Sequence, residues 1–474
     1  MPILDSNDSL VTIASRLAHK DYSSVDLTSG YLERIERLDG NLHSFNNVMA
    51  DRALSDARLA DQERAVGQLR GPLHGIPFAV KDVYDVQGAV TTCGSPAFKN
   101  NVAKGDATAI ARLRKGGAVL LGKLATHELT HGGVDFGLPW PPACNPWNLK
   151  YDPGGSSSGP GAAVAAGLCA FALGTDTGGS IRKPAGMCGI TGLKPTFGRV
   201  SRHGVMLNAH SLDHCGPMAH TAADCAIILQ AIAGQDSFDS VCATESVPDY
   251  ATAIGNDIRG TRVGVVSSFW LEDLPASATV CAGMHEAVQT LKQLGAEVRE
   301  VKLRPIAEYM ATKLTIQRSE LFAAYGRDIQ SRREQFGPNI RNRMDGYDLI
   351  TAADYHAAKL HQSELTADML HAMADVDVLV TAGPGPAVLL ADAAVRARAA
   401  PSADLALPFN LTGFPAIATC IGFTDGDLPF SMQIIGRPFD EFAVLSVADA
   451  YERATPWHLR RPKIRTQADE TAVV

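Results

Sequence analysis

The sequence predicts an α/β fold: a single large domain with a mixed, twisted β-sheet that helices cover on both faces. Segments typical of strands and of helices alternate to the end of the chain, which favours one α/β domain. The 474 residues are 46% hydrophobic and 20% charged, so the chain can bury a sizeable core. Only 6% are aromatic, which indicates small, aliphatic packing of alanine-rich helices on a sheet.

The N-terminal part of the chain, residues 1–70, predicts a helical arm. Its apolar side chains recur at helical spacing, as at Leu10, Ile13 and Leu17. Ser24 is a suitable N-cap for a further helix, and a Gly-Pro pair ends the arm. We therefore expect an arm at 1–70 followed by an α/β domain at 71–474.

The first part of that domain, about 71–220, predicts a catalytic core. Short apolar runs at 76–80 and 118–121 indicate buried strands. Few charged residues occur over 145–195, where Gly, Ser, Ala and Thr dominate, and such a composition indicates burial. The 14 residues 161–174 predict a buried helix, since they are too few to span a bilayer.

The second part of the domain continues the alternation. Residues 262–303 predict a strand, a helix over 278–294 and a second strand, with Gly295 ending the helix. A polar helical insert is expected over about 304–373. Further buried strands are expected at 376–380, 416–422 and 431–435.

Charge and cysteine content exclude several classes of protein. The 43 basic and 51 acidic residues give a net charge of −8, which argues against nucleic acid or an anionic membrane as a partner. The nine cysteines are odd in number and form no CxxC pair, which favours free thiols in a reducing compartment. Charged residues interrupt the first 17 positions, so no signal peptide is expected and we predict a cytoplasmic protein.

Three short motifs predict other chemistries. His127 to His131 reads HExxH, which on a helix would make a zinc metalloprotease, the alternative from another class. The usual third ligand is missing, and Gly132-Gly133 would break the helix. Residues 117–123 match GxxxxGK around an apolar strand, with Leu124 where a magnesium-binding hydroxyl is needed. Residues 155–159 match GxSxG, but no buried strand precedes them.

A combination of segments carries a more specific signal. Gly75 to Asp82 precedes the run Gly-Gly-Ser-Ser-Ser-Gly at 154–159, and Gly-Thr-Asp-Thr-Gly-Gly-Ser follows at 174–180. Together and in this order they resemble the amidase signature family of serine amidohydrolases. Further segments that look like the family's lie at 192–199, 408–413 and 433–437. The resemblance covers nearly the whole chain.

The resemblance implies a Ser–Ser–Lys triad and no metal or organic cofactor. Ser180 would be the nucleophile, Ser156, after a cis Gly155–Ser156 peptide, the bridging hydroxyl, and Lys81 the base. Ser157 is expected either to support this network by hydrogen bonding or simply to fill the turn. The reaction would break the C–N bond of a small amide, carbamate or urea through an acyl-enzyme.

The chemistry sets two requirements on these residues. A lysine accepts a proton near neutral pH only if burial destabilises its ammonium form, and the apolar run before Lys81 fits that need. Asp82 and Asp85 would oppose this effect, so they should face elsewhere. The developing oxyanion needs fixed donors, which backbone N–H groups at Thr177, Gly178, Gly179 and Ser180 could supply. The resemblance to the family further implies that Asp176 and Arg182, which flank this turn, brace it as an ion pair.

The sequence says less about the substrate and the partners. We expect a stand-alone amidase with a small-molecule amide substrate, and Thr130 and His131 as candidates for its pocket. The alternative within the family is the glutaminase (A) subunit of a tRNA-dependent amidotransferase. That branch usually carries a Ser-Arg-Tyr-Asp-Gly run, which residues 315–325 lack. The arm and the insert offer surfaces for a homodimer.

Overall fold

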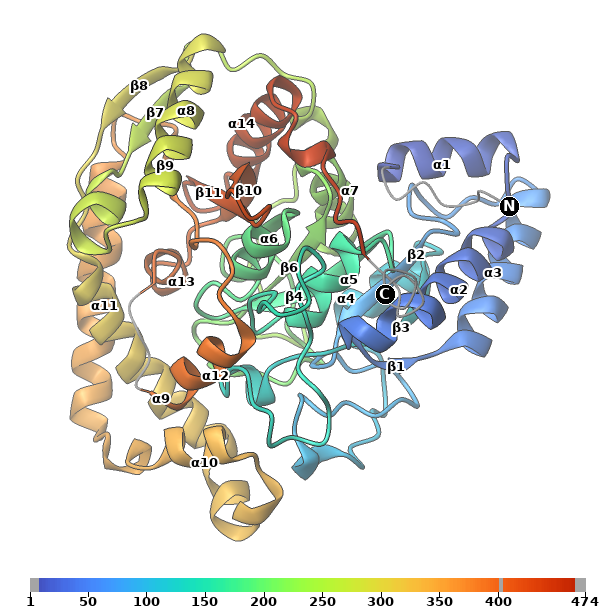
Figure 1. The fold of residues 1–474 in the computed structure, drawn as a ribbon, viewed down its shortest axis with the longest axis horizontal. Helices are drawn as coiled ribbons and strands as arrows, with labels where there is room; N and C mark the ends of the chain where they lie inside the picture. Colours follow the sequence, from blue (N-terminus) through green and yellow to red (C-terminus); the bar gives the residue numbers. More distant parts are fainter. Residues whose placement is uncertain (1–7, 400–403, 465–474) are drawn as a thin grey trace, which may run out of the picture.

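The computed structural model describes residues 8–399 and 404–464, which build a single α/β domain around one sheet (Figure 1). The sheet has 11 strands in the order β1-β3-β2-β4-β6-β5-β10-β11-β9-β7-β8. The strands span β1 (Phe45–Val48), β2 (Pro77–Lys81), β3 (Val119–Leu124), β4 (Phe171–Asp176), β5 (Thr191–Lys194), β6 (His214–Ala219), β7 (Arg262–Val265), β8 (Glu297–Glu300), β9 (Val378–Ala382), β10 (Ala416–Phe423) and β11 (Pro429–Gly436). Parallel pairs (β2 with β3 and β4, β7 with β8 and β9) combine with antiparallel ones, so the predicted mixed sheet is confirmed.

The N-terminal arm holds three helices, α1 (Leu10–His19), α2 (Ser24–Leu42) and α3 (Ala50–Ala65), which lie to the right in Figure 1. The side chain of Ser23 caps α2, one residue before the predicted Ser24, which is instead buried and donates to the carbonyl oxygen of Gly75. The arm also contributes β1, which pairs with β3 at the edge of the sheet. The arm therefore joins the sheet of the domain that follows it.

The centre of the chain corrects one prediction. The stretch 161–174 is not one buried helix: α5 (Ser158–Ala165) ends early, and the chain re-enters the sheet as β4. Gly167 at φ 65° and the turn around it separate the two elements. All of α5 is nevertheless buried, as the low charge of this region indicates. The β2, β4 and α5 segments thus meet in the interior.

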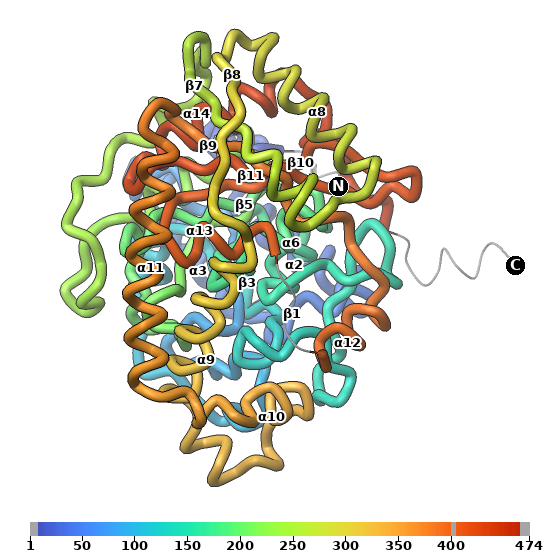
Figure 2. Tube along the Cα trace, turned by 90° about the vertical axis from the view of Figure 1, so that its left-hand side faces the viewer, coloured from blue at the N-terminus to red at the C-terminus, as the bar shows by residue number. Residues whose placement is uncertain are grey.

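The helices of the remaining chain cover the sheet and build the insert. They span α4 (Thr108–Lys115), α6 (Arg182–Cys188), α7 (Ala222–Ile232), α8 (Ala278–Gln293), α9 (Ile306–Ser331), α10 (Pro338–Met344), α11 (Ala352–Ala372), α12 (Leu390–Arg398), α13 (Leu407–Leu411) and α14 (Glu441–Ala454). The predicted insert is helical and consists of α9, α10 and α11. Helices α9 and α11 pack against each other along one side of the molecule, which faces the viewer in Figure 2. Within the described residues, no helix combines the length and the apolarity needed to cross a bilayer.

Candidate active site

Lys81 ends β2 and is completely buried. Its Nζ lies 2.8 Å from the Oγ of Ser156 and 2.8 Å from the Oγ1 of Thr175. Burial lowers the pKa of the Lys81 ammonium to about 7, because no carboxylate among the described residues lies within ion-pair distance of it. A lysine so placed can exchange protons with a hydroxyl at neutral pH.

Asp82, the next residue, faces away from Lys81 as the proposed chemistry requires. Its carboxylate lies 2.9 Å from the Nζ of Lys123 on β3. Within the part of the chain that the structure describes, Asp85 likewise forms no ion pair with Lys81. Neither acidic group therefore forms an ion pair with Lys81 that would hold it in its charged form.

Ser156 follows a cis peptide bond to Gly155, as the family resemblance implies. A Cβ at residue 155 would lie 2.0 Å from the Cε1 of His127, so only glycine permits this close approach of the imidazole. Burial lowers the pKa of His127 to about 3, which keeps its ring neutral. The neighbouring Ser157 N–H donates to the carbonyl oxygen of Ser180 at 3.3 Å, which joins the two serine segments.

Ser180 lies half-buried at the end of the Thr177–Ser180 turn, before α6. Ser156 and Ser180 line the same cavity. Among the described residues, the Ser180 Oγ has no hydrogen-bond partner, so it is free to bond a substrate or the hydroxyl of Ser156 within the cavity. The structure brings Lys81 and Ser156 into direct contact and places Ser180 beside them.

One of the four predicted oxyanion donors is engaged within the turn itself. The N–H of Gly179 donates to the Oδ1 of Asp176 at 2.6 Å and is thus already used. The N–H groups of Gly178 and Ser180 have no such partner within the described residues, and both residues line the cavity with Thr177. Gly179 instead provides a backbone φ of 104°, which the turn needs and which other residues rarely adopt.

The predicted ion pair of Asp176 with Arg182 is present and fully buried. The guanidinium contacts both carboxylate oxygens, with Nε at 3.0 Å and Nη2 at 3.1 Å. Burial alone would raise the pKa of Asp176, but the Arg182 charge outweighs it and holds that pKa far below the usual range. The sequence analysis missed two further partners: Asn410 donates to Asp176 at 2.8 Å, and Gln433 accepts from Arg182 at 2.8 Å. Both lie in segments already matched to the family, which was the available signal.

Ser157 and Thr175 form a second layer behind the triad. The Ser157 Oγ donates to the carbonyl oxygen of Thr175 at 3.2 Å and accepts from its N–H at 3.3 Å. The hydroxyl of Thr175 in turn contacts Lys81. Sequence reasoning missed the role of Thr175, although it lies in the run 174–180 that carries the family resemblance, because no spacing in the sequence brings it next to Lys81.

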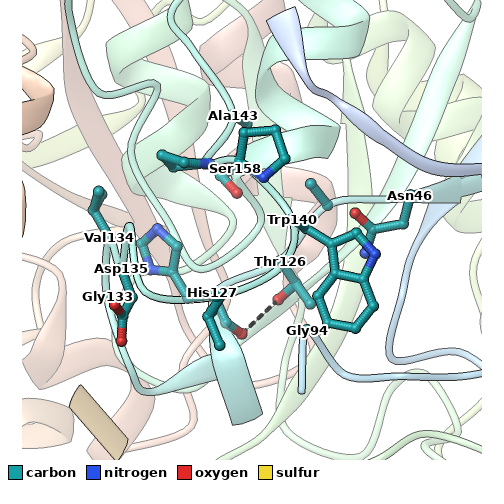
Figure 3. A pocket seen from close by; sticks show the side chains of 14 residues that line it. Asn46, Gly94, Thr126, His127, Gly133, Val134, Asp135, Trp140, Ala143 and Ser158 are labelled. Carbon is teal, nitrogen blue, oxygen red and sulfur yellow. Dashed lines mark hydrogen bonds between the residues drawn. The ribbon is translucent and has the colours of Figure 1, made fainter. Parts of the chain in front are cut away.

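The cavity above these residues has a volume of about 620 Å³. Its wall includes both predicted pocket residues, Thr130 and His131. His131 is held by the hydroxyl of Tyr347 at 2.9 Å, and burial keeps its pKa well below the usual value. His127 lines this cavity and also a second, smaller pocket, whose wall includes Asn46 and Trp140 (Figure 3).

The competing motifs lack the geometry that their chemistry needs. The HExxH run is not an α-helix, because Leu129 and Thr130 have left-handed backbone angles, so His127 and His131 are not on one helical face. Within the described residues, no cluster of His, Cys, Asp or Glu could hold a metal ion. The GxxxxGK run forms β3, whose Lys123 is buried against Asp82 rather than on a phosphate loop.

Comparison with known proteins places this site in context. A family model described as Amidase matches residues 26–445. The chain is 41% identical to the glutamyl-tRNA(Gln) amidotransferase (A) subunit from Roseiflexus castenholzii, over 95% of this chain and 96% of that one. Native peptide amidase from Stenotrophomonas maltophilia superposes with a TM-score of 0.86 at 29% identity, covering 98% and 100% of the two chains. The glutamyl-tRNA(Gln) amidotransferase (A) subunit from Thermotoga maritima gives a TM-score of 0.81 at 29% identity over 98% and 99%.

Proposed function

The chain belongs to the amidase family, and on this premise we propose that it hydrolyses the C–N bond of a small amide through a seryl acyl-enzyme. One observation carries the proposal. A fully buried lysine has hydroxyls as its partners, and one of them, Ser156, shares a cavity with the half-buried hydroxyl of Ser180. A Ser–Ser–Lys proton relay uses these three groups, and its remaining contact, between the hydroxyls of Ser156 and Ser180, would form when substrate occupies the cavity.

In the proposed cycle, the Oγ of Ser180 attacks the carbonyl carbon of the amide. Its proton passes to Ser156, and the proton of Ser156 passes to the neutral amine of Lys81. The N–H groups of Gly178 and Ser180 stabilise the oxyanion of the tetrahedral intermediate. The relay then returns the proton to the departing nitrogen, the C–N bond breaks, and an ester on Ser180 remains.

Water then hydrolyses the acyl-enzyme, and its proton passes along the same relay of Ser156 and Lys81. It attacks the ester carbonyl while Ser156 and Lys81 accept its proton, and the Ser180 oxygen leaves and is reprotonated. One amide and one water give one carboxylic acid and one amine or ammonia. Because burial lowers the pKa of Lys81 to about 7, the neutral amine needed for both halves is available at physiological pH.

For the substrate, the names of the relatives favour the amidotransferase function over a stand-alone enzyme. At 41% identity over nearly the whole chain, a protein named as the (A) subunit of a glutamyl-tRNA(Gln) amidotransferase supports a role in which the amide supplies ammonia to partner subunits. We therefore propose glutamine as the first amide to test. The sequence motifs alone favour a stand-alone amidase, whereas the names of the relatives favour the amidotransferase subunit.

A stand-alone amidase is the second candidate, and one observation favours it. Residues 315–325, which lack the Ser-Arg-Tyr-Asp-Gly run, lie in α9, and Gln317 of this stretch lines the cavity. The run that the family resemblance associates with glutamine binding is therefore absent from this part of the cavity wall. The fold similarity to peptide amidase is consistent with a stand-alone amidase, just as the similarity to the amidotransferase subunit is consistent with the first candidate.

The test measures ammonia or amine release by the purified chain alone. The substrates are glutamine, aliphatic primary amides, anilides, ureas and aryl carbamates, with the Ser180→Ala variant as the blank. Glutamine turnover, or activity only after subunits from a homologous amidotransferase are added, would support the amidotransferase function. Turnover of other amides without glutamine would support the stand-alone enzyme. No turnover in any arm, together with no labelling of Ser180 by a fluorophosphonate, would overturn the proposed reaction.

A further inference from the structure

A second buried lysine, Lys313 of α9, borders the candidate oxyanion turn. Its side chain is 5% exposed and lines the same cavity as Ser180. A Cβ at Gly178 would lie 2.8 Å from the Nζ of Lys313, so the ammonium sits directly against the backbone that would receive the substrate oxygen. The proposed relay through Lys81 does not use this group.

The partners of Lys313 leave its charge unbalanced. Its Nζ donates to the Oε1 of Gln317. The Gln317 Nε2 donates to the Oδ1 of Asn208 at 2.6 Å, and the Asn208 Nδ2 donates to the carbonyl oxygen of Leu129 at 3.1 Å. This chain of hydrogen bonds fixes Gln317 with its carbonyl toward Lys313. Within the described residues, no carboxylate lies within ion-pair distance of Lys313, and two of its three N–H donors have no protein acceptor.

The other cation beside the turn is already neutralised. Lys183 passes Gly179 and pairs with Asp404 at 2.7 Å. Arg343, also in the cavity wall, donates to the backbone carbonyls of His131 and Ala397 and has no acidic partner among the described residues. The described wall thus carries more basic than acidic groups, and Lys313 is the buried one that lies against Gly178 of the turn.

An unpaired ammonium in this position is costly without a ligand. Burial, followed by the charge of Lys183, lowers the pKa of Lys313 to about 7. An anion that entered the cavity would offset this cost and accept the two unused N–H donors. A lysine that only filled space would be better replaced by methionine at the same length.

We propose that Lys313 binds a carboxylate of the substrate, and therefore that the substrates are amides whose acyl part carries a carboxylate a few bonds from the scissile carbonyl. Monoamides of short dicarboxylic acids are the simplest members of this class, and glutamine is a longer member. The inference rests on the proposed amide hydrolysis, whose substrate class it narrows. It assigns Lys313 a role in specificity and leaves the proton relay to Lys81.

The test compares two amides of equal shape. Succinamate carries the carboxylate, and 4-oxopentanamide carries a methyl ketone in its place. We expect wild type to have a kcat/KM at least 30-fold higher for succinamate. Malonamate is one methylene shorter than succinamate, and glutaramate is one methylene longer. Comparing kcat/KM for the three amides shows how far the anion site lies from the scissile carbonyl. Equal kcat/KM values for succinamate and 4-oxopentanamide would overturn the proposal.

Variants separate charge from packing. Lys313→Met should raise KM for succinamate about 30-fold while its effect on 4-oxopentanamide stays within threefold, and Lys302→Met, at an exposed lysine outside the cavity, serves as the control. An equal loss for both amides would show a structural role and overturn the proposal. If Lys313→Met does not fold, calorimetric titration of succinate into Ser180→Ala decides: binding competitive with succinamate supports the site, and no binding overturns it. Turnover of neutral amides alone would overturn this inference and leave the proposed hydrolysis standing.

Discussion

Two buried lysines at the ends of neighbouring parallel strands differ in what they contact. Lys81 on β2 meets the hydroxyls of Ser156 and Thr175, whereas Lys123 on β3 meets the carboxylate of Asp82 at 2.9 Å and the hydroxyl of Thr91. Both side chains are fully buried. The two lysines therefore differ in their partners: Lys81 contacts only hydroxyls, whereas Lys123 forms a buried ion pair with Asp82.

The largest effect that this comparison predicts is on catalysis. Lys81→Met should lower kcat/KM by about 10⁴-fold, because it removes the proposed base. The free energy of unfolding should change by no more than about 1 kcal/mol, since an apolar side chain of similar size replaces a buried amine that has no charged partner. Steady-state kinetics and urea unfolding measure the two quantities. A rate near that of wild type would remove Lys81 from the mechanism.

The matched change on β3 should act on stability instead. Lys123→Met leaves the Asp82 carboxylate buried without its cation, which costs about 3–5 kcal/mol in the free energy of unfolding. The fraction that stays folded should keep its kcat, because Lys123 does not reach the cavity. Urea unfolding with active-site titration checks both. The double variant with Asp82→Asn should recover part of the loss, and no recovery would contradict the ion pair's role.

A carboxylate placed beside Lys81 should give this lysine the kind of partner that Lys123 has in Asp82. In wild type, kcat/KM should rise with pH through about 7, because burial sets the pKa of Lys81 there and only the neutral amine acts as a base. In Thr175→Asp, the new anion favours the ammonium form and should raise that pKa by about 1–3 units. Activity at pH 7 should then fall about 10- to 100-fold and return at higher pH. Rates measured from pH 5 to 10 test this, and an unmoved midpoint would contradict it.

The smallest effect is expected where one hydroxyl is lost. Thr175→Val keeps the shape of the side chain and removes one of the two hydrogen bonds to Lys81. A neutral hydrogen bond contributes about 0.5–1.5 kcal/mol, so kcat should fall about two- to tenfold. Stopped assays at saturating amide measure it. A loss as large as that of Lys81→Met would mean that Thr175, rather than Ser156, carries the proton.

Much of the architecture could be predicted from the sequence. Apolar runs placed β2, β3, β7, β10 and β11 within a few residues, and helical spacing found the buried face of α1. The prediction failed over 161–174, where small residues suit a tight helix as well as a buried strand and only packing against β2 and β6 selects the strand. Ser23 rather than Ser24 caps α2 for the same reason, since two adjacent serines are equivalent until the tertiary structure orients them.

By itself, the sequence determined the family, the order of Lys81, Ser156 and Ser180, and the buried setting of the first of them. Only the tertiary structure decided which charged side chains pair with each other. Asp82 is adjacent to Lys81 in sequence but pairs with Lys123, since successive residues of an extended chain point to opposite sides and the neighbouring strand supplies the partner. Asn410 and Lys313 likewise reach the site from distant segments. Electrostatics near a reactive group depends on distances through space, which the folded chain alone sets.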